Sequence, residues 1–270
     1  MPGVCVVVGA SSKWQADGSS TAAEHDGQAV DMHSVPLGAR FGIGGGIARR
    51  FALEGFTMAL LSRNVDNVAA LRQQIISEGG SAEAIACELA DHGSIVAAFE
   101  AAAKLGPLEV LVLNPGYTSH GASAVLAEDL DVSMFDDAHN TQSRGPFLCC
   151  QQVLRAMRES DEPCSILMTS VPQALGGSPK GLPNSVSKAG QRGLAQVLAG
   201  EYGRFGVHVG HVVINGVVAS PGTVDIMPLE RQMDAMAVAE TFWQLHAQHP
   251  TVWTHEVVIQ PSTARIATRL

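Results

Sequence analysis

A run of apolar residues that ends in a glycine turn is the feature that most constrains this chain. Val4–Val8 are all apolar, Gly9-Ala10-Ser11-Ser12 follows them, and Gly42-Ile43-Gly44 lies much further along. Without the intervening residues 13–41, the two parts read as a strand, a tight glycine turn and a helix start. That arrangement holds a dinucleotide pyrophosphate at a helix N-terminus. The pattern predicts cofactor contacts at Gly9, Ser11, Ser12, Gly42, Ile43 and Gly44.

Residues 13–41 divide this glycine motif. The segment is rich in Gly, Ser, Ala, Asp and His, has little apolar periodicity and is predicted to be a loop. Loops longer than about 15 residues are uncommon inside a compact domain. Three explanations stay open: a surface insertion beside the cofactor site, a translated intron or gene-model error whose excision restores the motif, and a functional lid.

Short apolar strands alternate with helical patterns along the rest of the chain. At 270 residues, with 46% apolar and 16% charged residues, the chain fits one globular α/β domain. We expect a Rossmann-type, doubly wound parallel sheet of seven strands with helices on both faces. The domain prediction is 1–270, with the inserted loop at 13–41. Strands are predicted at 4–8, 57–61, 82–87, 109–113, 164–168, 207–214 and 256–259. Helices are predicted at 45–54, 65–78, 92–105, 135–158, 184–204 and 229–248.

Charge and residue spacing exclude several function classes. The net charge of −9 argues against a nucleic-acid or anionic-membrane surface. No apolar run approaches the roughly 20 residues that span a bilayer, and no basic region precedes the first apolar run, so a signal peptide is not expected. The cysteines show no Cys-x-x-Cys spacing and the histidines show no metal-ligand spacing. We expect no metal, no membrane, no nucleic acid and a reducing, cytoplasmic location, with an organellar lumen as the alternative.

The second predicted strand ends in Ser62-Arg63-Asn64. A carboxylate at this point would bind the ribose 2′-hydroxyl of NAD and repel a 2′-phosphate. None is present, Ser62 can donate a hydrogen bond, and the Arg63 guanidinium suits a phosphate. This favours NADP(H) over NAD(H); the alternative is an ordinary exposed arginine.

Two further strand ends carry candidate cofactor contacts. Glu88, followed by Leu89, comes after the third strand, where an acid can accept from an adenine amino group; a solvated turn carboxylate is the alternative. Asn114-Pro115-Gly116 follows the fourth strand.

The order of these motifs resembles that of the short-chain dehydrogenase/reductase family over nearly the whole chain. Asn114 and Gly116 match a family motif that stabilises the central strand beside the cofactor, whereas Pro115 departs from it and lacks a backbone donor. The other matching motifs are Gly9-Ala10-Ser11-Ser12 joined to Gly42-Ile43-Gly44, then Ser62-Arg63, Gly145-Pro146-Phe147-Leu148, Met168-Thr169-Ser170 and Ser187-Lys188-Ala189-Gly190.

The resemblance implies four catalytic positions, and this chain departs from the family at two of them. Lys188 matches the lysine and Ser170 the serine. The position four residues before Lys188 is Asn184 and not the catalytic tyrosine, and the asparagine position falls on Gln142. An amide does not titrate near neutral pH, so Asn184 cannot be the general acid. Some family members that reduce dienoyl thioesters also lack the tyrosine; a water held by Ser170, Asn184 and Lys188 would deliver the proton here.

The resemblance further implies a backbone contact to the nicotinamide after the sixth strand, where Gly216 follows Asn215 in place of Pro-Gly. Residues 217–229 are expected to form a lid over a partly apolar small-molecule substrate. We expect an NADP(H)-dependent oxidoreductase that acts on a carbonyl, an alcohol or an activated alkene. One alternative is a catalytically silent nucleotide-binding relative that acts as a sensor or partner subunit. The other is a non-functional product whose cofactor site is disrupted by residues 13–41. A homodimer or homotetramer is also implied.

Overall fold

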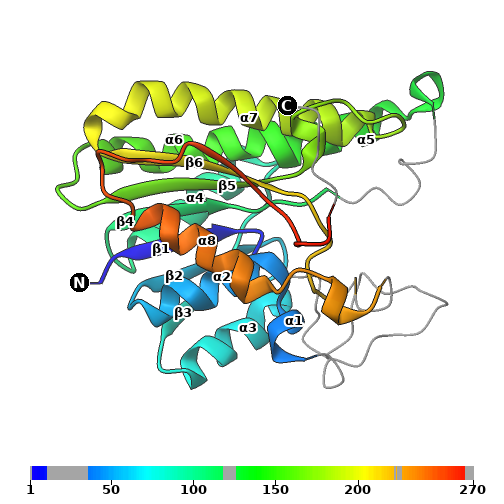
Figure 1. Ribbon diagram of the computed structural model, residues 1–270. Helices are drawn as coiled ribbons and strands as arrows, with labels where there is room; N and C mark the ends of the chain where they lie inside the picture. Colours follow the sequence, from blue (N-terminus) through cyan, green and yellow to red (C-terminus); the bar gives the residue numbers. More distant parts are fainter. Residues whose placement is uncertain (1, 11–35, 118–125, 222, 224–226, 265–270) are drawn as a thin grey trace.

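The computed structural model describes residues 2–10, 36–117, 126–221, 223 and 227–264. Its centre is a parallel seven-stranded sheet, as predicted, and the strands lie in the order β3-β2-β1-β4-β5-β6-β7 (Figure 1). The strands are β1 (Val4–Val8), β2 (Thr57–Ser62), β3 (Ser81–Ala86), β4 (Leu108–Leu113), β5 (Cys164–Ser170), β6 (Val207–Ile214) and β7 (Glu256–Ile259).

The central strands are apolar because helices cover both of their faces. Every residue of β1, β2, β5 and β6 is buried, whereas the edge strand β3 alternates exposed and buried positions. Val4 of β1 pairs with Thr57 of β2 on one side, and Val8 pairs with Leu113 of β4 on the other. The chain therefore reverses its direction of winding between β1 and β4. In open parallel sheets, ligands bind outside the carboxyl ends of the strands at such a point.

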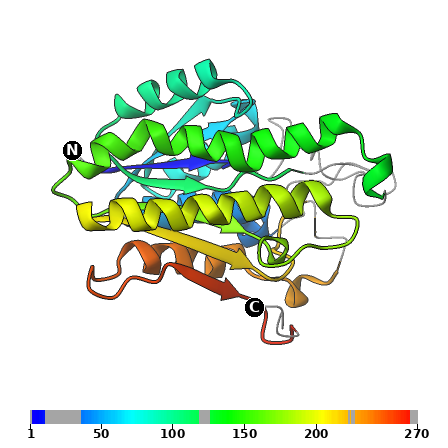
Figure 2. The same ribbon diagram turned by 90° about the horizontal axis from the view of Figure 1, so that it is seen from above.

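Two layers of helices enclose the sheet (Figure 1, Figure 2). One layer contains α1 (Leu37–Arg40), α2 (Gly42–Leu53), α3 (Asp66–Ser77) and α8 (Ala235–His246). The other contains α4 (His92–Ala103), α6 (Gly145–Arg158) and α7 (Leu182–Tyr202), with α5 (Val132–His139) before α6. Each layer has its own core: Phe51 and Phe242 are buried in the first, and Phe99 and Met157 in the second.

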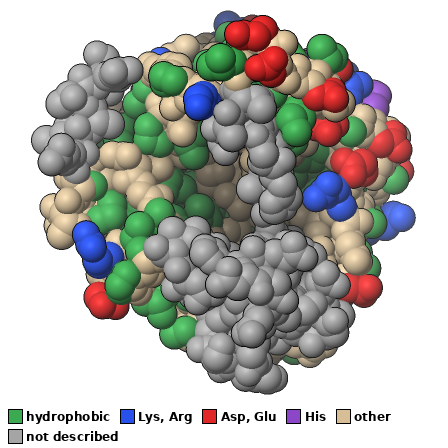
Figure 3. Space-filling view, turned by 90° about the vertical axis from the view of Figure 1, so that its right-hand side faces the viewer, with side chains coloured by type: hydrophobic (Ala, Val, Ile, Leu, Met, Phe, Trp, Pro, Cys, Tyr) green, Lys and Arg blue, Asp and Glu red, His purple; other side chains and the backbone are tan. Residues whose placement is uncertain are grey.

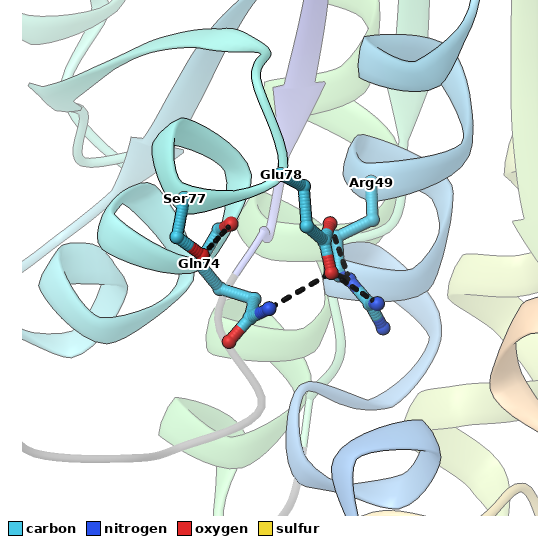
Figure 4. A network of polar contacts seen from close by, with 4 residues as sticks. All are labelled: Arg49, Gln74, Ser77 and Glu78. Atoms are coloured by element: carbon cyan, nitrogen blue, oxygen red, sulfur yellow. Dashed lines mark hydrogen bonds and ion pairs between the residues drawn. The ribbon is translucent and has the colours of Figure 1, made fainter.

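Helices α2 and α3 are joined by a polar network at the start of the loop to β3 (Figure 4). The Arg49 guanidinium donates to both carboxylate oxygens of Glu78, and the Gln74 amide donates to the same carboxylate at 2.8 Å. The Ser77 hydroxyl caps the turn by donating to the Gln74 carbonyl. The network fixes the edge of the first helix layer and lies away from the carboxyl ends of the strands.

The long helix predicted at 135–158 is interrupted. It begins at Val132 and contains a π-helical turn, Asn140–Arg144, in which the Gly145 N–H donates to the Asn140 carbonyl. Pro146 follows and has no N–H to continue the α-helical pattern. The prediction at 229–248 is also wrong in its first part, because a 3₁₀ turn at Leu229–Arg231 leads into extended residues before Asp234 caps α8.

A short helix lies in the segment predicted to be a loop. α1 occupies Leu37–Arg40, and the Phe41 side chain that follows is only 6% exposed. Gly42 then turns the chain into α2 with a φ of 57°. The end of residues 13–41 is therefore helical and packed, which corrects the loop prediction there. Residues 13–35 of the predicted loop lie outside the part of the chain that the structure describes. The described residues of the segment begin at Pro36.

Candidate functional site

The predicted site residues that the structure describes lie mainly at the carboxyl ends of the strands. Seen from that end, the molecule is hollowed at its centre, and backbone and hydrophobic side chains line the hollow (Figure 3). Ser11 and Ser12 lie outside the described residues.

Gly9 and Gly44 bring β1 and the first turn of α2 into direct contact. Gly9 has a φ of 78°, and a Cβ at Gly44 would overlap the Gly9 carbonyl oxygen. The Asn114 amide donates to that same carbonyl at 2.8 Å and ties the end of β4 to the turn. Side chains larger than hydrogen would fill this space at both glycines. The close approach of backbone that a pyrophosphate requires is therefore present.

Helix α2 presents its N-terminus at this turn. Gly42, Ile43 and Gly44 form its first turn, and the residue before it, Phe41, provides no side-chain cap. Uncapped N–H groups and the positive end of the helix dipole favour an anion. These residues fit a dinucleotide phosphate.

Ser62 and Arg63 lie where β2 ends. Ser62 is 8% exposed and Arg63 is exposed. The Asn64 side chain accepts from the Asp66 N–H at 3.0 Å at the start of α3. The next carboxylate along the chain, that of Asp66, therefore belongs to a helix start and not to the end of the strand. Arg63 is the cation at this position.

Glu88 and Leu89 take part in contacts within the protein. The Glu88 carboxylate accepts from the Ala90 N–H at 3.2 Å, and the Glu88 N–H donates to the Ser94 hydroxyl at 2.9 Å. Leu89 is buried against Gly145, at the start of α6. Both residues shape the turn after β3.

Lys188 is buried at the carboxyl end of β5. Its side chain enters from α7, and its ammonium donates to the Thr169 carbonyl and to the Gln191 amide oxygen, both at 3.0 Å. The residue is 4% exposed, and burial lowers the pKa of Lys188 to about 7. A lysine with this pKa can hold or release a proton near neutral pH.

Ser170 and Gln142 meet the same region from two other elements. Ser170 follows Thr169 directly and is 2% exposed. The Ser143 hydroxyl donates at 2.7 Å to the carbonyl of Ser187, the residue before Lys188, so the π-helical turn that carries Gln142 lies against α7. The Ser170 hydroxyl oxygen and the Gln142 amide oxygen are buried, and neither has a hydrogen-bond partner in the part of the chain that the structure describes. Such atoms indicate a polar partner that binds there.

Asn184 lies one helical turn before Lys188 on α7 and is half-buried. The structure thus brings Ser170, Lys188 and Gln142 to one end of the sheet and puts Asn184 on the adjoining turn. Sequence reasoning did not single out Gln191, the direct partner of Lys188. Its place three residues after Lys188 on one helix was the available signal.

The remaining predicted contacts are exposed glycines. Gly116 is exposed after β4, and Gly216 is exposed after β6, where a Cβ would meet Met233 and Pro261. Separately, an apolar cavity of about 750 Å³ lies between the segment before α5, the loop after β5 and the first turns of α7. It is lined by Leu126, Leu130, Leu175, Leu182, Pro183 and Val186, among others.

Within the described residues, no cluster of three or more potential metal ligands occurs. Among the same residues, no helix is both long enough and apolar enough to span a bilayer.

The sequence profile described as short chain dehydrogenase matches residues 35–229. This chain belongs to the short chain dehydrogenase family. D-threitol dehydrogenase from Mycolicibacterium smegmatis is 32% identical over 177 residues, which cover 65% of this chain and 66% of that protein. Glucose 1-dehydrogenase from Gluconobacter oxydans is 27% identical over 238 residues, covering 82% and 87%.

Solved structures agree with this membership of the short chain dehydrogenase family. A short-chain dehydrogenase from Rhodopseudomonas palustris has a TM-score of 0.69 and 27% identity, covering 81% of this chain and 93% of that one. A metagenomic short-chain oxidoreductase solved in complex with NADP has a TM-score of 0.74 and 23% identity, covering 96% and 97%. The latter likeness is one of fold. The chain is therefore an oxidoreductase of this family, and the fold implies a nicotinamide cofactor.

Proposed function

We propose that this chain is an NADP(H)-dependent oxidoreductase that acts on a carbonyl, an alcohol or an activated alkene through an atypical active site. The observation that carries the proposal is the buried ammonium of Lys188 beside Ser170, on a helix that has Asn184 where the family has tyrosine. When bound, the nicotinamide cofactor supplies or accepts the hydride. The protein's own residues must then handle the proton.

Ser170, Asn184 and Lys188 divide this task. The unpaired Ser170 hydroxyl can hold the substrate oxygen or a water molecule. Asn184 can orient that water but cannot protonate the substrate. Lys188, with its pKa lowered to about 7, can supply a proton through the water at neutral pH. The unpaired Gln142 oxygen takes the place of the family's asparagine as a second anchor for water.

The pyrophosphate of the cofactor would be held at the turn between β1 and α2, by Gly9, Gly42, Ile43, Gly44 and Asn114. Ser62 and the exposed Arg63 support a preference for NADP(H), because β2 does not end in a carboxylate. A guanidinium binds a 2′-phosphate through two parallel hydrogen bonds. The Asp66 carboxylate lies in the first turn of α3, where its negative charge interacts favourably with the positive end of the helix dipole.

The apolar cavity beside α7 supports a partly apolar substrate. Exposed Phe147 on α6, with Val186 and Val197 on α7, supports a homodimer or homotetramer that packs through these helices. The single-domain organisation and the cytoplasmic location stay predictions.

One observation favours a second function. The Lys188 ammonium already donates to two groups of the protein itself, the Thr169 carbonyl and the Gln191 amide oxygen. A nucleotide-binding protein without hydride chemistry, acting as a sensor or partner subunit, fits this state. Replacing Lys188 with alanine separates the two: loss of a measured turnover with retained NADPH binding supports the enzyme, and tight binding without turnover of any substrate supports the alternative.

The experiment that tests the proposal is a fluorescence titration of the purified chain with NADPH and with NADH. We expect NADPH to bind more tightly. Arg63→Ala should reduce the preference roughly tenfold, because a charge-assisted hydrogen bond contributes about 1.5–3 kcal/mol. Arg72→Ala removes an arginine that pairs with Glu83 on the neighbouring α3–β3 surface and serves as the matched control. Equal binding of the two cofactors, or no effect of Arg63→Ala, would contradict the assignment.

A further inference from the structure

Three polar residues of α7, Lys188, Gln191 and Arg192, lie within five positions of one another, and two of them bond to strands of the sheet. Lys188 bonds to Thr169 of β5, and Arg192 bonds to the Glu256 carboxylate of β7 at 2.6 and 2.8 Å. Gln191 lies between them, is fully buried, and accepts from Lys188 through its amide oxygen. Its amide nitrogen is buried and has no hydrogen-bond partner among the described residues.

His211 of β6 lies under the same stretch of α7. It pairs in register with Met168 of β5 on one side and with Glu256 of β7 on the other. Its ring is fully buried, and its Nδ1 lies 3.0 Å from the Glu256 carboxylate. A carboxylate only accepts, so Nδ1 carries the proton. The second ring nitrogen, Nε2, is buried, and no described residue forms a hydrogen bond with it.

The two unpaired nitrogens are chemically complementary. The Gln191 Nε2 is a donor because its amide oxygen already faces Lys188. The His211 Nε2 is an acceptor because the ring proton lies on Nδ1. Leaving either one unpaired in the interior is unfavourable, and a water molecule that accepts from one and donates to the other satisfies both.

We propose that Gln191 and His211 bind one buried water molecule between their unpaired nitrogens and so form, with Glu256, a network that positions the Lys188 side chain. The network runs from the carboxyl end of β5 to the edge strand β7. An amide does not relay a proton between its oxygen and nitrogen under these conditions, so Gln191 and His211 are positioning residues. Their importance for chemistry rests on the proposed function, whereas the network itself does not.

The charges around His211 keep its role one of hydrogen bonding. The charged groups that act on it are Glu256 from β7 and Lys188 and Arg192 from α7. Burial lowers the pKa of His211 to about 4, so the ring is neutral near pH 7. Replacing it with phenylalanine therefore removes hydrogen bonds and no charge.

The test is the titration of Lys188, followed by NMR of protein labelled with ¹³C at the lysine Cε. The other lysines are Lys13, Lys104 and Lys180, and the signal of Lys188 is assigned by its absence in Lys188→Met. We expect His211→Phe to lower the pKa of Lys188 by roughly 0.5, equal to about 0.7 kcal/mol, because Gln191 is no longer held toward the ammonium. His211→Gln keeps a donor and an acceptor and should restore most of the wild-type value.

His208→Phe is the matched control. His208 is buried on the same strand, but it bonds to the carbonyls of Leu245 and Thr254 and packs on Trp253. It should leave the Lys188 titration unchanged. If the pKa of Lys188 is unchanged in His211→Phe, or changes equally in His208→Phe, the proposed network is overturned.

The unmodified protein offers a second measurement. The ¹⁵N resonances of His211 should show a proton on Nδ1 and a hydrogen-bonded, unprotonated Nε2, and a proton on Nε2 would overturn the proposal. The NMR results and the cofactor titration fail independently. A confirmed network without NADPH binding would reject the proposed function alone, and NADPH binding without the network would reject this inference alone.

Discussion

Asn184 is the residue by which the proposed active site departs from the tyrosine that the family resemblance implies. It lies one turn before Lys188 and is half-buried, so a larger side chain at this position can reach the substrate side of α7. A phenol there would be a titratable proton donor beside a cation.

Asn184→Tyr is therefore expected to create or raise the reduction of generic carbonyl compounds. General acid catalysis contributes roughly 100-fold or more, and we expect a gain of that order in turnover with NADPH. Asn184→Phe adds the ring without the hydroxyl and should give no gain. A folded Asn184→Tyr variant that is no more active than Asn184→Phe would count against this placement of the active site.

Lys188 makes stability depend on pH. Its pKa is about 7 in the folded protein and about 10.5 in the unfolded chain, so between these values the unfolded chain binds more protons. Stability from this group therefore rises with pH across that window. Relative to Lys188→Met, the wild type should gain up to about 1.4 kcal/mol in free energy of unfolding per pH unit.

Urea unfolding of both proteins between pH 7 and 8.5 measures this difference. Cys5, Cys149 and Cys150 are buried and their pKa values are raised, but they are the same in both proteins and cancel. A difference between the two proteins that stays constant with pH would show that Lys188 titrates normally.

At the scale of elements, the contact between β1 and α2 makes the cradle that we propose for the cofactor. Gly44 allows the first turn of α2 to approach Gly9 and Asn114, and the backbone of β1 cannot easily move, because it lies at the centre of the sheet. The π-helical turn before α6 has a comparable role, since it brings Gln142 against α7.

Gly44→Ala should destabilise the protein by about 1–3 kcal/mol and weaken NADPH binding at least tenfold, because the added methyl group overlaps the Gly9 carbonyl. Gly193→Ala, on α7, adds the same methyl group into open space and should be neutral or stabilising by up to about 1 kcal/mol. Urea unfolding and the cofactor titration measure both effects. Equal behaviour of the two variants would show that the cradle tolerates side chains.

At the scale of the molecule, two cores on opposite faces of one sheet hold the site in place. Ala39 and Phe41 belong to the same core as Phe51 and Phe242, so the end of residues 13–41 is integrated into the fold. This observation bears on the three explanations for the segment: removing all of 13–41 would also remove two core side chains.

Phe41→Ala is expected to lower the free energy of unfolding by about 3–5 kcal/mol, as for other buried aromatic side chains. Leu53→Ala, at the far end of α2, removes a side chain that is 60% exposed and should cost about 0.5 kcal/mol or less. Urea unfolding compares them. A small effect of Phe41→Ala would mean that α1 and Phe41 contribute little to the core.

The parallel seven-stranded sheet and the helices on its two faces were predictable from the sequence because strands and helices leave their own local patterns. The strand order was not, because it depends on which strands pair in space. Buried parallel strands are continuous apolar runs, as in Val4–Val8 and Val207–Ile214, and amphipathic helices between them show their own period. Asn114 at the end of β4 was also predictable, because carboxyl ends of parallel strands share one edge of the sheet. The exact helix ends, the π-helical turn and α1 were not, because they depend on Pro146 and on packing against distant residues.

The sequence by itself determined the α/β architecture, the glycine turn and the place of Lys188 one turn after Asn184. Only the tertiary structure decided that Lys188 is buried against Thr169, and that Gln191 and His211 each bury a nitrogen that has no hydrogen-bond partner among the described residues. The physical reason is that local patterns record which face of an element is apolar. They do not record which polar groups from α7, β5, β6 and β7 meet once water is excluded.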